Sequence, residues 1–409
     1  MQKDKSEILQ NKIKKKIMEQ ISYMDELSDE DMEQMISDYI SEEGKEIYLP
    51  LKERVAVGKE IFQSLRQLDI LQNLIDNQEI TEIMINGPDN IFVEKEGKLC
   101  RVNKNFESEE KLRNIIQQIV GKCNRVVNDA SPIVDARLSD GSRVNVVLNP
   151  IAINGPILTI RRFPRHPFTM EKLIEIGAVT QEAVSFLNLA VKAGYNIIIS
   201  GGTGSGKTTF LNALSGFIPG TERILTIEDS AELQIQGIEN LIRMETKNAN
   251  VENCKEITIR DLIKTSLRMR PDRIIVGEVR GAEAMDMICS AMNCGHDGSM
   301  STIHANTAKD ALLRLETMIL MAVNLPIHAI RQQISSGVDL IIHLGRLRDH
   351  SRKVLEIIEI DGMEGEEINY HTLYEFQEDR ETAGDCVNGS LKKRGELKND
   401  YKMRTAGFV

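Results

Sequence analysis

A glycine-rich segment near the middle of the chain has the residue types and spacing of a phosphate-binding loop. Residues 201–208, Gly-Gly-Thr-Gly-Ser-Gly-Lys-Thr, match the pattern G-x-x-x-x-G-K-[ST] without exception. The apolar run 196–200 predicts a strand before the loop, and residues 209–214 predict a helix after it. Glycine permits a tight loop that aims backbone N–H groups at phosphate oxygens, and the helix N-terminus adds its positive dipole end. The segment therefore predicts a nucleotide site rather than a chance glycine-rich turn.

The side chains of this loop predict ATP and Mg²⁺ as cofactors. Lys207 can bridge the β- and γ-phosphates as a point charge, and Thr208 can coordinate Mg²⁺. Eight consecutive residues are expected to contact the nucleotide: Gly202, Thr203, Gly204, Ser205, Gly206, Lys207, Thr208 and Thr209. The loop alone predicts only phosphate binding, so other residues must supply the chemistry of hydrolysis.

Two glutamates stand at the ends of predicted strands, where carboxylates can act on the phosphates. Glu228 can position or deprotonate the attacking water. Asp229 or Ser230 can also cap a helix that opens at Ala231, and the two interpretations are compatible. Glu278 is expected to hold Mg²⁺ directly or through water. The pattern leaves open which glutamate is the general base.

A histidine follows at the end of a third predicted strand. The run 295–298, Gly-His-Asp-Gly, predicts a sharp turn, and Thr302 and His304 share one face of the strand that follows. We expect His304 to sense the γ-phosphate. A lone histidine in a strand is otherwise a hydrogen-bonded core residue, so this assignment depends on the motifs that precede it.

Arginines in the first half of the chain could complete such a site. Arg137 and Arg143 lie in a predicted hairpin, and Arg161 and Arg162 end the next strand. They are either surface charges or residues that neutralise the charge developing on the phosphates when a small domain folds over the nucleotide.

The hydrophobic pattern divides the chain into regions that would position these residues. From residue 171 onward, continuous apolar runs alternate with helical segments, which indicates a parallel sheet in an α/β domain. Before it, short strands and an Asp-Gly turn indicate a small α+β domain. The expected regions are a charged helical N-terminal region, a small α+β domain, a linker, a P-loop ATPase domain and a weakly ordered polar tail: 1–74, 75–163, 164–170, 171–378 and 379–409.

The N-terminal region is highly charged and helical in pattern. Four apolar residues fall on one helical face: Ile13, Ile17, Ile21 and Met24. This face belongs either to a solvated amphipathic helix or to a helix that docks on a membrane or a partner.

Composition restricts the class of protein. The chain has 409 residues, a formal net charge of −11 and 28% charged residues. The acidic balance argues against direct nucleic-acid binding. We expect no transmembrane segment and no secretory signal, and the six cysteines contain no C-x-x-C pair, which suits the cytosol and disfavours a zinc site.

The order of the motifs resembles the secretion ATPase superfamily of type II secretion, type IV secretion and type IV pili. Four strings carry this resemblance, called Walker A, Asp box, Walker B and His box: 201–208, 227–232, 275–280 and 295–306. A closer resemblance is to the CpaF-like branch, which drives Flp/Tad pilus assembly. It is carried by further strings: 81–88, 134–138, 140–144, 158–163 and 310–318. Together the resemblance spans about residues 50–380.

The resemblance implies a ring-shaped homohexamer of cytoplasmic subunits with RecA-like domains, which reaches the membrane through an inner-membrane platform protein. It implies that the small domain and the RecA-like domain sandwich ATP and move as it turns over. It also implies that Arg143 and Arg161 reach the phosphates, whereas Arg137 and Arg162 have less support. The absence of a four-cysteine zinc module sets the sequence apart from many type II secretion ATPases.

Other functions compete with a pilus or secretion motor. A conjugative or DNA-uptake ATPase could use nearly the same sequence. A nucleotide-switch GTPase would need an N-K-x-D motif after the loop, and the sequence contains none. A small-molecule kinase would need neither the arginine-bearing first domain nor the His304 strand.

Overall fold

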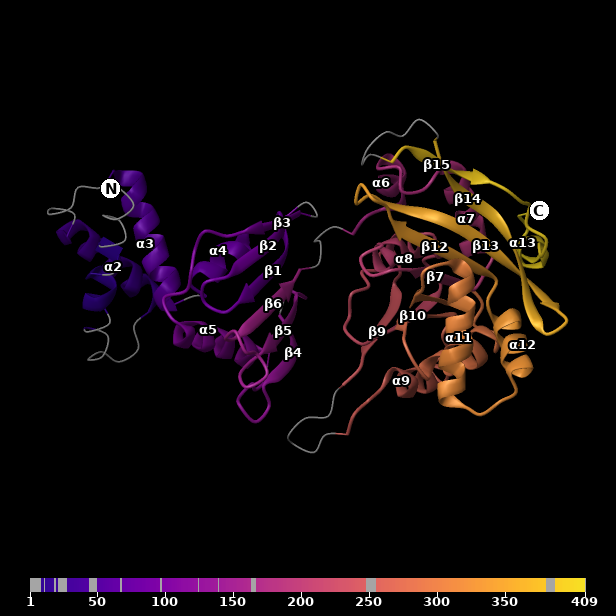
Figure 1. Cartoon of the computed structure of the whole chain (residues 1–409), viewed down its shortest axis with the longest axis horizontal. Helices are drawn as coiled ribbons and strands as arrows, with labels where there is room; N and C mark the ends of the chain where they lie inside the picture. The colour runs from indigo at the N-terminus through magenta and orange to yellow at the C-terminus, as the bar shows by residue number, and fades with distance from the viewer. Residues whose placement is uncertain are drawn as a thin grey trace. The chain divides into compact units, whose positions relative to one another are not determined.

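The computed structural model describes most of the chain: residues 9–10, 12–17, 20, 28–43, 50–66, 68–95, 98–123, 125–138, 140–162, 167–247, 255–379 and 387–408. The described residues divide into two compact units, one within residues 1–164 and the other within residues 165–409. Figure 1 shows the helices and strands of each unit. Each unit has its own hydrophobic clusters, so each is a folded body in its own right.

The first unit begins with helices that pack through their apolar faces. α2 (Asp29–Glu43) and α3 (Leu51–Arg66) surround a cluster that includes the fully buried Ile13 and Ile17. These two isoleucines therefore serve packing within the unit. The other residues predicted for this face lie outside the described residues: Ile21 and Met24.

Six described strands of the first unit form an antiparallel sheet in the order β3-β2-β1-β6-β5-β4. Their bounds are β1 (Ile80–Asn86), β2 (Ile91–Lys95), β3 (Lys98–Arg101), β4 (Ile133–Arg137), β5 (Arg143–Val147) and β6 (Ile157–Arg161). The helices α4 (Ile70–Asp76) and α5 (Glu109–Lys122) share one hydrophobic cluster with this sheet. This arrangement confirms the predicted α+β fold.

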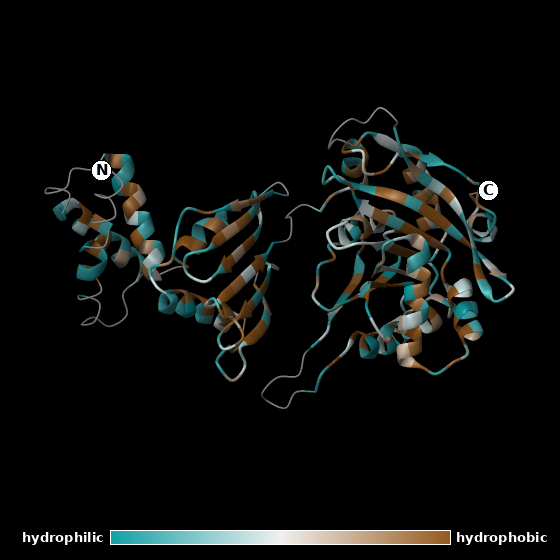
Figure 2. Ribbon diagram, viewed as in Figure 1, coloured by the Kyte–Doolittle hydropathy of each residue, from teal (hydrophilic) through white to brown (hydrophobic). Residues whose placement is uncertain are grey.

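Nine described strands of the second unit form a mixed sheet in the order β15-β14-β13-β12-β7-β11-β10-β8-β9. The parallel part holds β7 (Ile197–Gly201), β8 (Arg223–Glu228), β9 (Asn240–Glu245), β10 (Arg273–Val279), β11 (Met300–His304) and β12 (Leu340–Arg346). Three antiparallel strands extend it: β13 (Arg352–Glu364), β14 (Glu367–Glu378) and β15 (Gly389–Lys393). Figure 2 shows hydrophobic residues gathered on the strands.

Helices cover both faces of the larger sheet, which is why its central strands are apolar without alternation. One face packs on α6 (Met170–Glu175), α7 (Gln181–Lys192) and α8 (Lys207–Ser215). The other face packs on α9 (Ile259–Ser266), α10 (Glu283–Met285), the π-helix η1 (Asp286–Met292), α11 (Ala308–Ala322) and α12 (Ile327–Gly337). The predicted α/β domain with a parallel-strand core is therefore confirmed. The predicted linker 164–170 falls partly outside the described residues, and Met170 is already the first residue of α6.

The prediction of a weakly ordered tail was wrong for residues 387–408. β15 pairs with β14, and α13 (Tyr401–Thr405) buries Met403 against the core of the second unit. Polar contacts fix the segment between them, since Tyr195 Oη donates to the carbonyl of Asn399 at 2.7 Å. A segment rich in charged residues looks unstructured in sequence when its few apolar residues and its ion pairs have distant partners.

No single described helix is long and apolar enough to cross a membrane. α11 and α12 together have the length and composition of a span, but they are bent by 120° at the break between them. Both helices contribute buried residues to the cluster beneath the sheet.

Candidate nucleotide site

The phosphate-binding loop connects a buried central strand to a helix, as predicted. β7 is buried along its whole length and ends at Gly201, and α8 begins at Lys207. Gly204 and Gly206 have φ angles of +69° and +94°. Residues with a Cβ atom adopt these angles only at an energetic cost, so the two glycines let the backbone turn directly into the N-terminus of α8.

Lys207 is buried, and its ammonium group lies over the loop. Nζ donates hydrogen bonds of 3.0 Å to the carbonyl oxygens of Gly201 and Gly202. Burial lowers the pKa of Lys207, and the carboxylate of Glu278 opposes this shift. Phosphate oxygens of a bound nucleotide could replace these carbonyl contacts, because both are oxygen acceptors.

His304 lies between Lys207 and Glu278. Its Nδ1 is 3.2 Å from Lys207 Nζ, and its Nε2 is 3.0 Å from Glu278 Oε1. Because an ammonium group can only donate, Nδ1 of a neutral ring must accept, and the ring proton is then on Nε2, which is within ion-pair distance of the carboxylate but makes no hydrogen bond to Oε1. Burial lowers the pKa of His304, which favours this neutral form. Three predicted residues therefore form one continuous chain of contacts.

Glu278 also has a cationic neighbour that the sequence motifs did not identify. Its Oε2 accepts a hydrogen bond of 2.9 Å from Arg280 Nη2, and Arg280 Nη1 lies 3.7 Å from Asp229 Oδ2. Arg280 stands two residues after Glu278, so the period of a strand could have placed both on one face. Thr302 donates to the carbonyl of Gly277 at 2.8 Å, so the face that Thr302 shares with His304 is turned toward β10.

Glu228 lies in a different environment, at the buried end of β8. Only 3% of its surface is exposed. Its Oε2 accepts hydrogen bonds from the backbone N–H groups of Glu232 (2.7 Å) and Leu233 (2.9 Å), and its Oε1 has no partner among the described residues. Burial raises the pKa of Glu228 to about 7. A carboxyl group with this pKa can accept a proton near neutral pH.

The helix proposed to open at Ala231 does not form. The residues that follow Glu228 are described and have no helical structure. The backbone N–H groups that a helix cap at Asp229 or Ser230 would have bound are instead held by the Glu228 carboxylate. The alternative reading of this segment was therefore wrong, because a longer side chain from the strand itself takes the capping role.

The residues predicted to hold Mg²⁺ have suitable donor chemistry. Thr208 supplies a hydroxyl group in the first turn of α8, and Glu278 supplies a carboxylate at β10. Within the described parts of the chain, no group of three or more His, Cys, Asp and Glu residues could hold a metal alone. Mg²⁺ commonly binds through one or two protein oxygens together with phosphates and water, and a hydroxyl and a carboxylate are oxygen donors of that kind.

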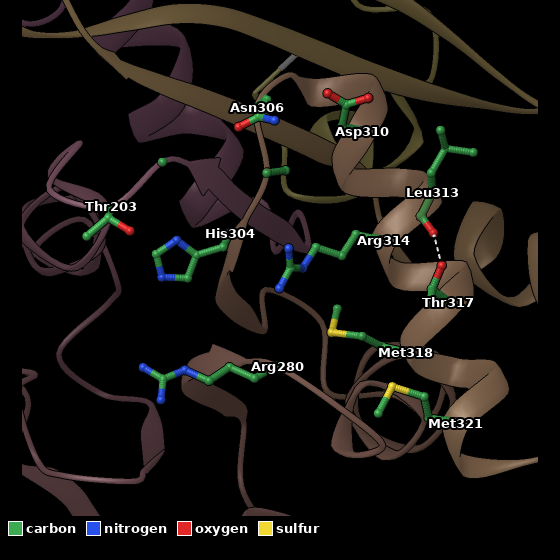
Figure 3. A pocket seen from close by; sticks show the side chains of 12 residues that line it. Thr203, Arg280, His304, Asn306, Asp310, Leu313, Arg314, Thr317, Met318 and Met321 are labelled. Carbon is green, nitrogen blue, oxygen red and sulfur yellow. Dashed lines mark hydrogen bonds between the residues drawn. The ribbon is translucent and has the colours of Figure 1, made fainter.

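A cavity of about 560 Å³ opens beside the loop. Its polar lining includes Thr203 of the loop, His304, Arg280 and Arg314. Figure 3 shows His304, Arg280 and Arg314 extending into this space, with Thr203 across from them. The far end is apolar and comes from α11: Leu313, Met318 and Met321. The cavity thus presents two arginines and a histidine beside the phosphate-binding loop.

The buried hydroxyl of Ser205 is a further sign of an anion site. Its Oγ is shielded from water and has no hydrogen-bond partner among the residues that the structure describes. Buried polar atoms normally find a partner, so an orphaned hydroxyl inside a phosphate-binding loop suits a ligand that supplies one.

The predicted arginines of the first unit form a row across three strands. The register places Arg137 opposite Arg143 and Arg143 opposite Arg161. Directly opposed residues of an antiparallel sheet point to the same face, so these three arginines share one face. Arg162 lies outside this row, and its Nη1 donates to the carbonyl of Ile80 at 3.2 Å, as Arg137 Nε donates to the carbonyl of Gly141 at 3.3 Å. The row belongs to the first unit and the loop to the second, so each is placed only within its own unit.

Comparison with known proteins identifies the family. Residues 64–397 match the model of the family described as type II/IV secretion system protein. A Mycobacterium tuberculosis protein provisionally named as a conjugal transfer protein is 34% identical over 302 residues, which cover 72% of this chain and 85% of that protein. Conjugal transfer protein TrbB of Rhizobium radiobacter is 31% identical over 312 residues, covering 76% and 92%. Type IV secretion system protein PtlH of Bordetella pertussis is 31% identical over 322 residues, covering 72% and 95%.

Solved structures of low identity support the fold. The pilus retraction motor PilT with bound ADP is 18% identical with a TM-score of 0.53, covering 83% of this chain and 87% of that chain. The Legionella pneumophila ATPase DotB is 21% identical with a TM-score of 0.52, covering 71% and 79%. On the family match over most of its length, this chain belongs to the type II/IV secretion system protein family and is an ATP-binding ATPase of that family.

Proposed function

We propose that this chain is the ATP-hydrolysing motor of a type IV secretion or conjugation system. The observation that carries the proposal is the chain of contacts from Lys207 through His304 to Glu278, with the buried Glu228 on a neighbouring strand. This is a set of groups for hydrolysis rather than for phosphate binding alone. The names of the relatives, conjugal transfer and type IV secretion proteins, support this kind of system over a pilus.

In the proposed reaction, ATP lies on the loop of residues 202–209. Lys207 exchanges its hydrogen bonds to the carbonyls of Gly201 and Gly202 for contacts with the β- and γ-phosphates. The side chain of His304 moves with Lys207, because the two are in contact. Glu228 takes the proton of the attacking water. Thr208 and Glu278 would hold Mg²⁺, which neutralises charge on the phosphates when it is bound.

The mechanical step is proposed to come from closure of the first unit over the nucleotide. Arg143 and Arg161 are directly opposed on one face of a sheet, so they can approach a polyanion together. Their contact with the γ-phosphate would exist only before hydrolysis, which would couple turnover to opening. Arg137 and Arg162 are weaker candidates, because Arg137 Nε donates to the carbonyl of Gly141 and Arg162 Nη1 donates to the carbonyl of Ile80.

Assembly and partners complete the proposal. ATPases of this family are typically hexameric, and we propose a homohexamer. We propose that it works at the cytoplasmic face of the membrane, where ATP is available, and engages an inner-membrane platform protein there.

Flp/Tad pilus assembly is the second candidate. The motif strings in the first unit and in α11 favour it: 81–88, 134–138, 140–144, 158–163 and 310–318. The pilus and the conjugative machine would use the same site, so only the cargo separates them.

The test has a biochemical arm and a cellular arm. We expect the purified chain with ATP and Mg²⁺ to run at about six times 46.1 kDa in light scattering and to hydrolyse ATP without an acceptor. Lys207→Ala should lower turnover by about 10³-fold or more, whereas Lys192→Ala, an exposed lysine on α7, should not. Full activity of Lys207→Ala would refute the site.

In its own host, the Lys207→Ala allele should abolish either DNA or protein transfer or surface pili. Loss of transfer with intact pili supports the first candidate, and loss of pili alone supports the second. Normal transfer and normal pili would refute both.

A further inference from the structure

An arginine far from the loop in sequence holds the loop in the structure. Arg352 is the first residue of β13, and its Nε donates a hydrogen bond of 2.8 Å to the carbonyl of Gly204. A Cβ atom built on Gly206 would lie 3.5 Å from Arg352 Cδ. The side chain therefore lies along the loop at two of its glycines. We propose that Arg352 is a positioning residue of the nucleotide site, which rests on the proposed binding of ATP to this loop.

The physical effect follows from the geometry of the peptide unit. In a trans peptide the C=O of one residue and the N–H of the next point in opposite directions. A donor that holds the carbonyl of Gly204 on one side of this peptide unit therefore directs the N–H of Ser205 to the opposite side of the same unit. That N–H donates to the carbonyl of Gly202 at 3.3 Å, a long hydrogen bond that a phosphate oxygen could replace.

Gly204 is the part of the loop that benefits from such support. Glycine populates many backbone conformations, and a Cβ atom built on Gly204 would meet no atom within 4 Å, so no neighbour packs against that side of the residue. An arginine donor is charged and makes a stronger hydrogen bond to a carbonyl than a neutral donor does. Arg352 therefore orders the loop before the nucleotide binds, which lowers the entropic cost of binding.

Arg352 is itself held by a hydrogen-bonded hairpin. It pairs with Arg346 of β12, and β12 lies beside β7, where Leu344 is in register with Gly201. Asp349 closes the turn, because its carboxylate accepts from the backbone N–H and the hydroxyl of Ser351.

The same turn is tied to the C-terminal segment. Asp349 Oδ2 accepts a hydrogen bond of 3.1 Å from the N–H of Val387, just before β15. The hairpin thus connects the antiparallel extension of the sheet to the phosphate-binding loop, and a change in that extension would reach the loop through Arg352.

The test compares two arginines that face each other in one ladder. In the full chain, Arg352→Ala should raise the Kd for a fluorescent ATP analogue and the KM for ATP by about 10-fold, with kcat within about threefold. Arg352→Lys keeps a charged donor and should restore at least half of the lost affinity. Arg346→Ala is the matched control, because Arg346 is exposed, and its affinity should equal that of the wild type.

Three outcomes separate this inference from the proposed function. Wild-type affinity of Arg352→Ala, or an equal loss in Arg346→Ala, would overturn the role of Arg352. Wild-type affinity of Lys207→Ala would instead overturn the nucleotide site itself. Thermal unfolding without nucleotide shows whether each variant is folded. If Arg352→Ala does not fold, Arg352→Gln is used in its place. An unchanged KM for ATP in Arg352→Gln would also count against the role of Arg352.

Discussion

The two glutamates of the site lie in different environments, which suit them to different chemical roles. Glu228 is buried, accepts two backbone N–H groups and has a pKa raised to about 7. Glu278 faces two cationic or basic groups, Arg280 and His304. Where two carboxylates are held so differently, the one with the raised pKa suits proton transfer, and the one that contacts Arg280 and His304 suits charge stabilisation. We therefore propose Glu228 as the general base.

The first prediction concerns the pH dependence of activity. The kcat/KM for ATP should rise with pH through a midpoint of about 7, because Glu228 must be ionised to accept a proton. Glu228→Gln should lower kcat by about 10²-fold or more and remove that limb from the residual activity. A pH profile that is identical in the wild type and in Glu228→Gln would contradict the assignment.

The same residue affects stability with a defined sign. Because the pKa of Glu228 in the folded protein is raised above the ordinary glutamate value of 4.5, the unfolded state holds fewer protons between about pH 4.5 and pH 7. Stability from this group is present below that window and is lost as the pH rises through it. At pH 8, the free energy of unfolding of Glu228→Gln, measured by urea titration, should therefore be roughly 1–3 kcal/mol higher than that of the wild type.

The second prediction concerns His304. Replacing it with alanine breaks the chain of contacts between Lys207 and Glu278. We expect His304→Ala to lower kcat by roughly 10–100-fold while the affinity for ADP changes little, because ADP lacks the γ-phosphate that this residue is proposed to sense. His328→Ala, an exposed histidine on α12, is the control. Equal losses in ATP turnover and ADP affinity would argue that His304 only stabilises the loop.

At the scale of elements, sequence was informative where patterns are local. The loop 201–208, the strands around it and the Asp-Gly turn at Gly141 follow from short-range patterns, and the structure has each of them. The antiparallel strands β13 to β15 were missed. Their charged residues interrupt the apolar runs, and their pairing partners are distant. Arg352 was missed for the same reason, since its partner Gly204 lies 148 positions away.

The third prediction concerns the C-terminal segment, which closes the end of β7 opposite the loop. Lys402 Nζ contacts the Asp339 carboxylate at 2.8 Å, and burial raises the pKa of Asp339. Removing the cation leaves a buried carboxylate without its charged partner, so Lys402→Ala should lower the free energy of unfolding by about 1–3 kcal/mol. Urea unfolding of the full chain measures this. Lys392→Ala, on the exposed face of β15, should change it by less than about 0.5 kcal/mol.

At the scale of the whole molecule, each unit carries one part of the proposed machine. The second unit has the loop, both glutamates and the histidine, whereas the first has the row of arginines. A motor needs an interaction that changes strength during the reaction cycle, because an equal interaction in all states does no work. Charge on the terminal phosphate is the quantity that changes on hydrolysis, so arginines from another unit are suited to detect it.

The fourth prediction tests this coupling. In the assembled full-length chain, Arg143→Ala should lower kcat by about 10²-fold with a smaller change in the Kd for ATP, because the lost contact is proposed to form as charge develops. Arg161→Ala should have a similar effect, and the double variant should lose less than the product of the two, since adjacent residues that contact one group are not independent.

The matched control is Arg101→Ala, since β3 is at the opposite edge of the same sheet from β4. Its turnover should equal that of the wild type. Light scattering must first show that each variant still assembles, because a loss of the ring would lower turnover for a different reason. Normal turnover of Arg143→Ala and Arg161→Ala in an intact ring would mean that hydrolysis is completed within the second unit, and motion would then have to be driven by contacts other than the arginine row.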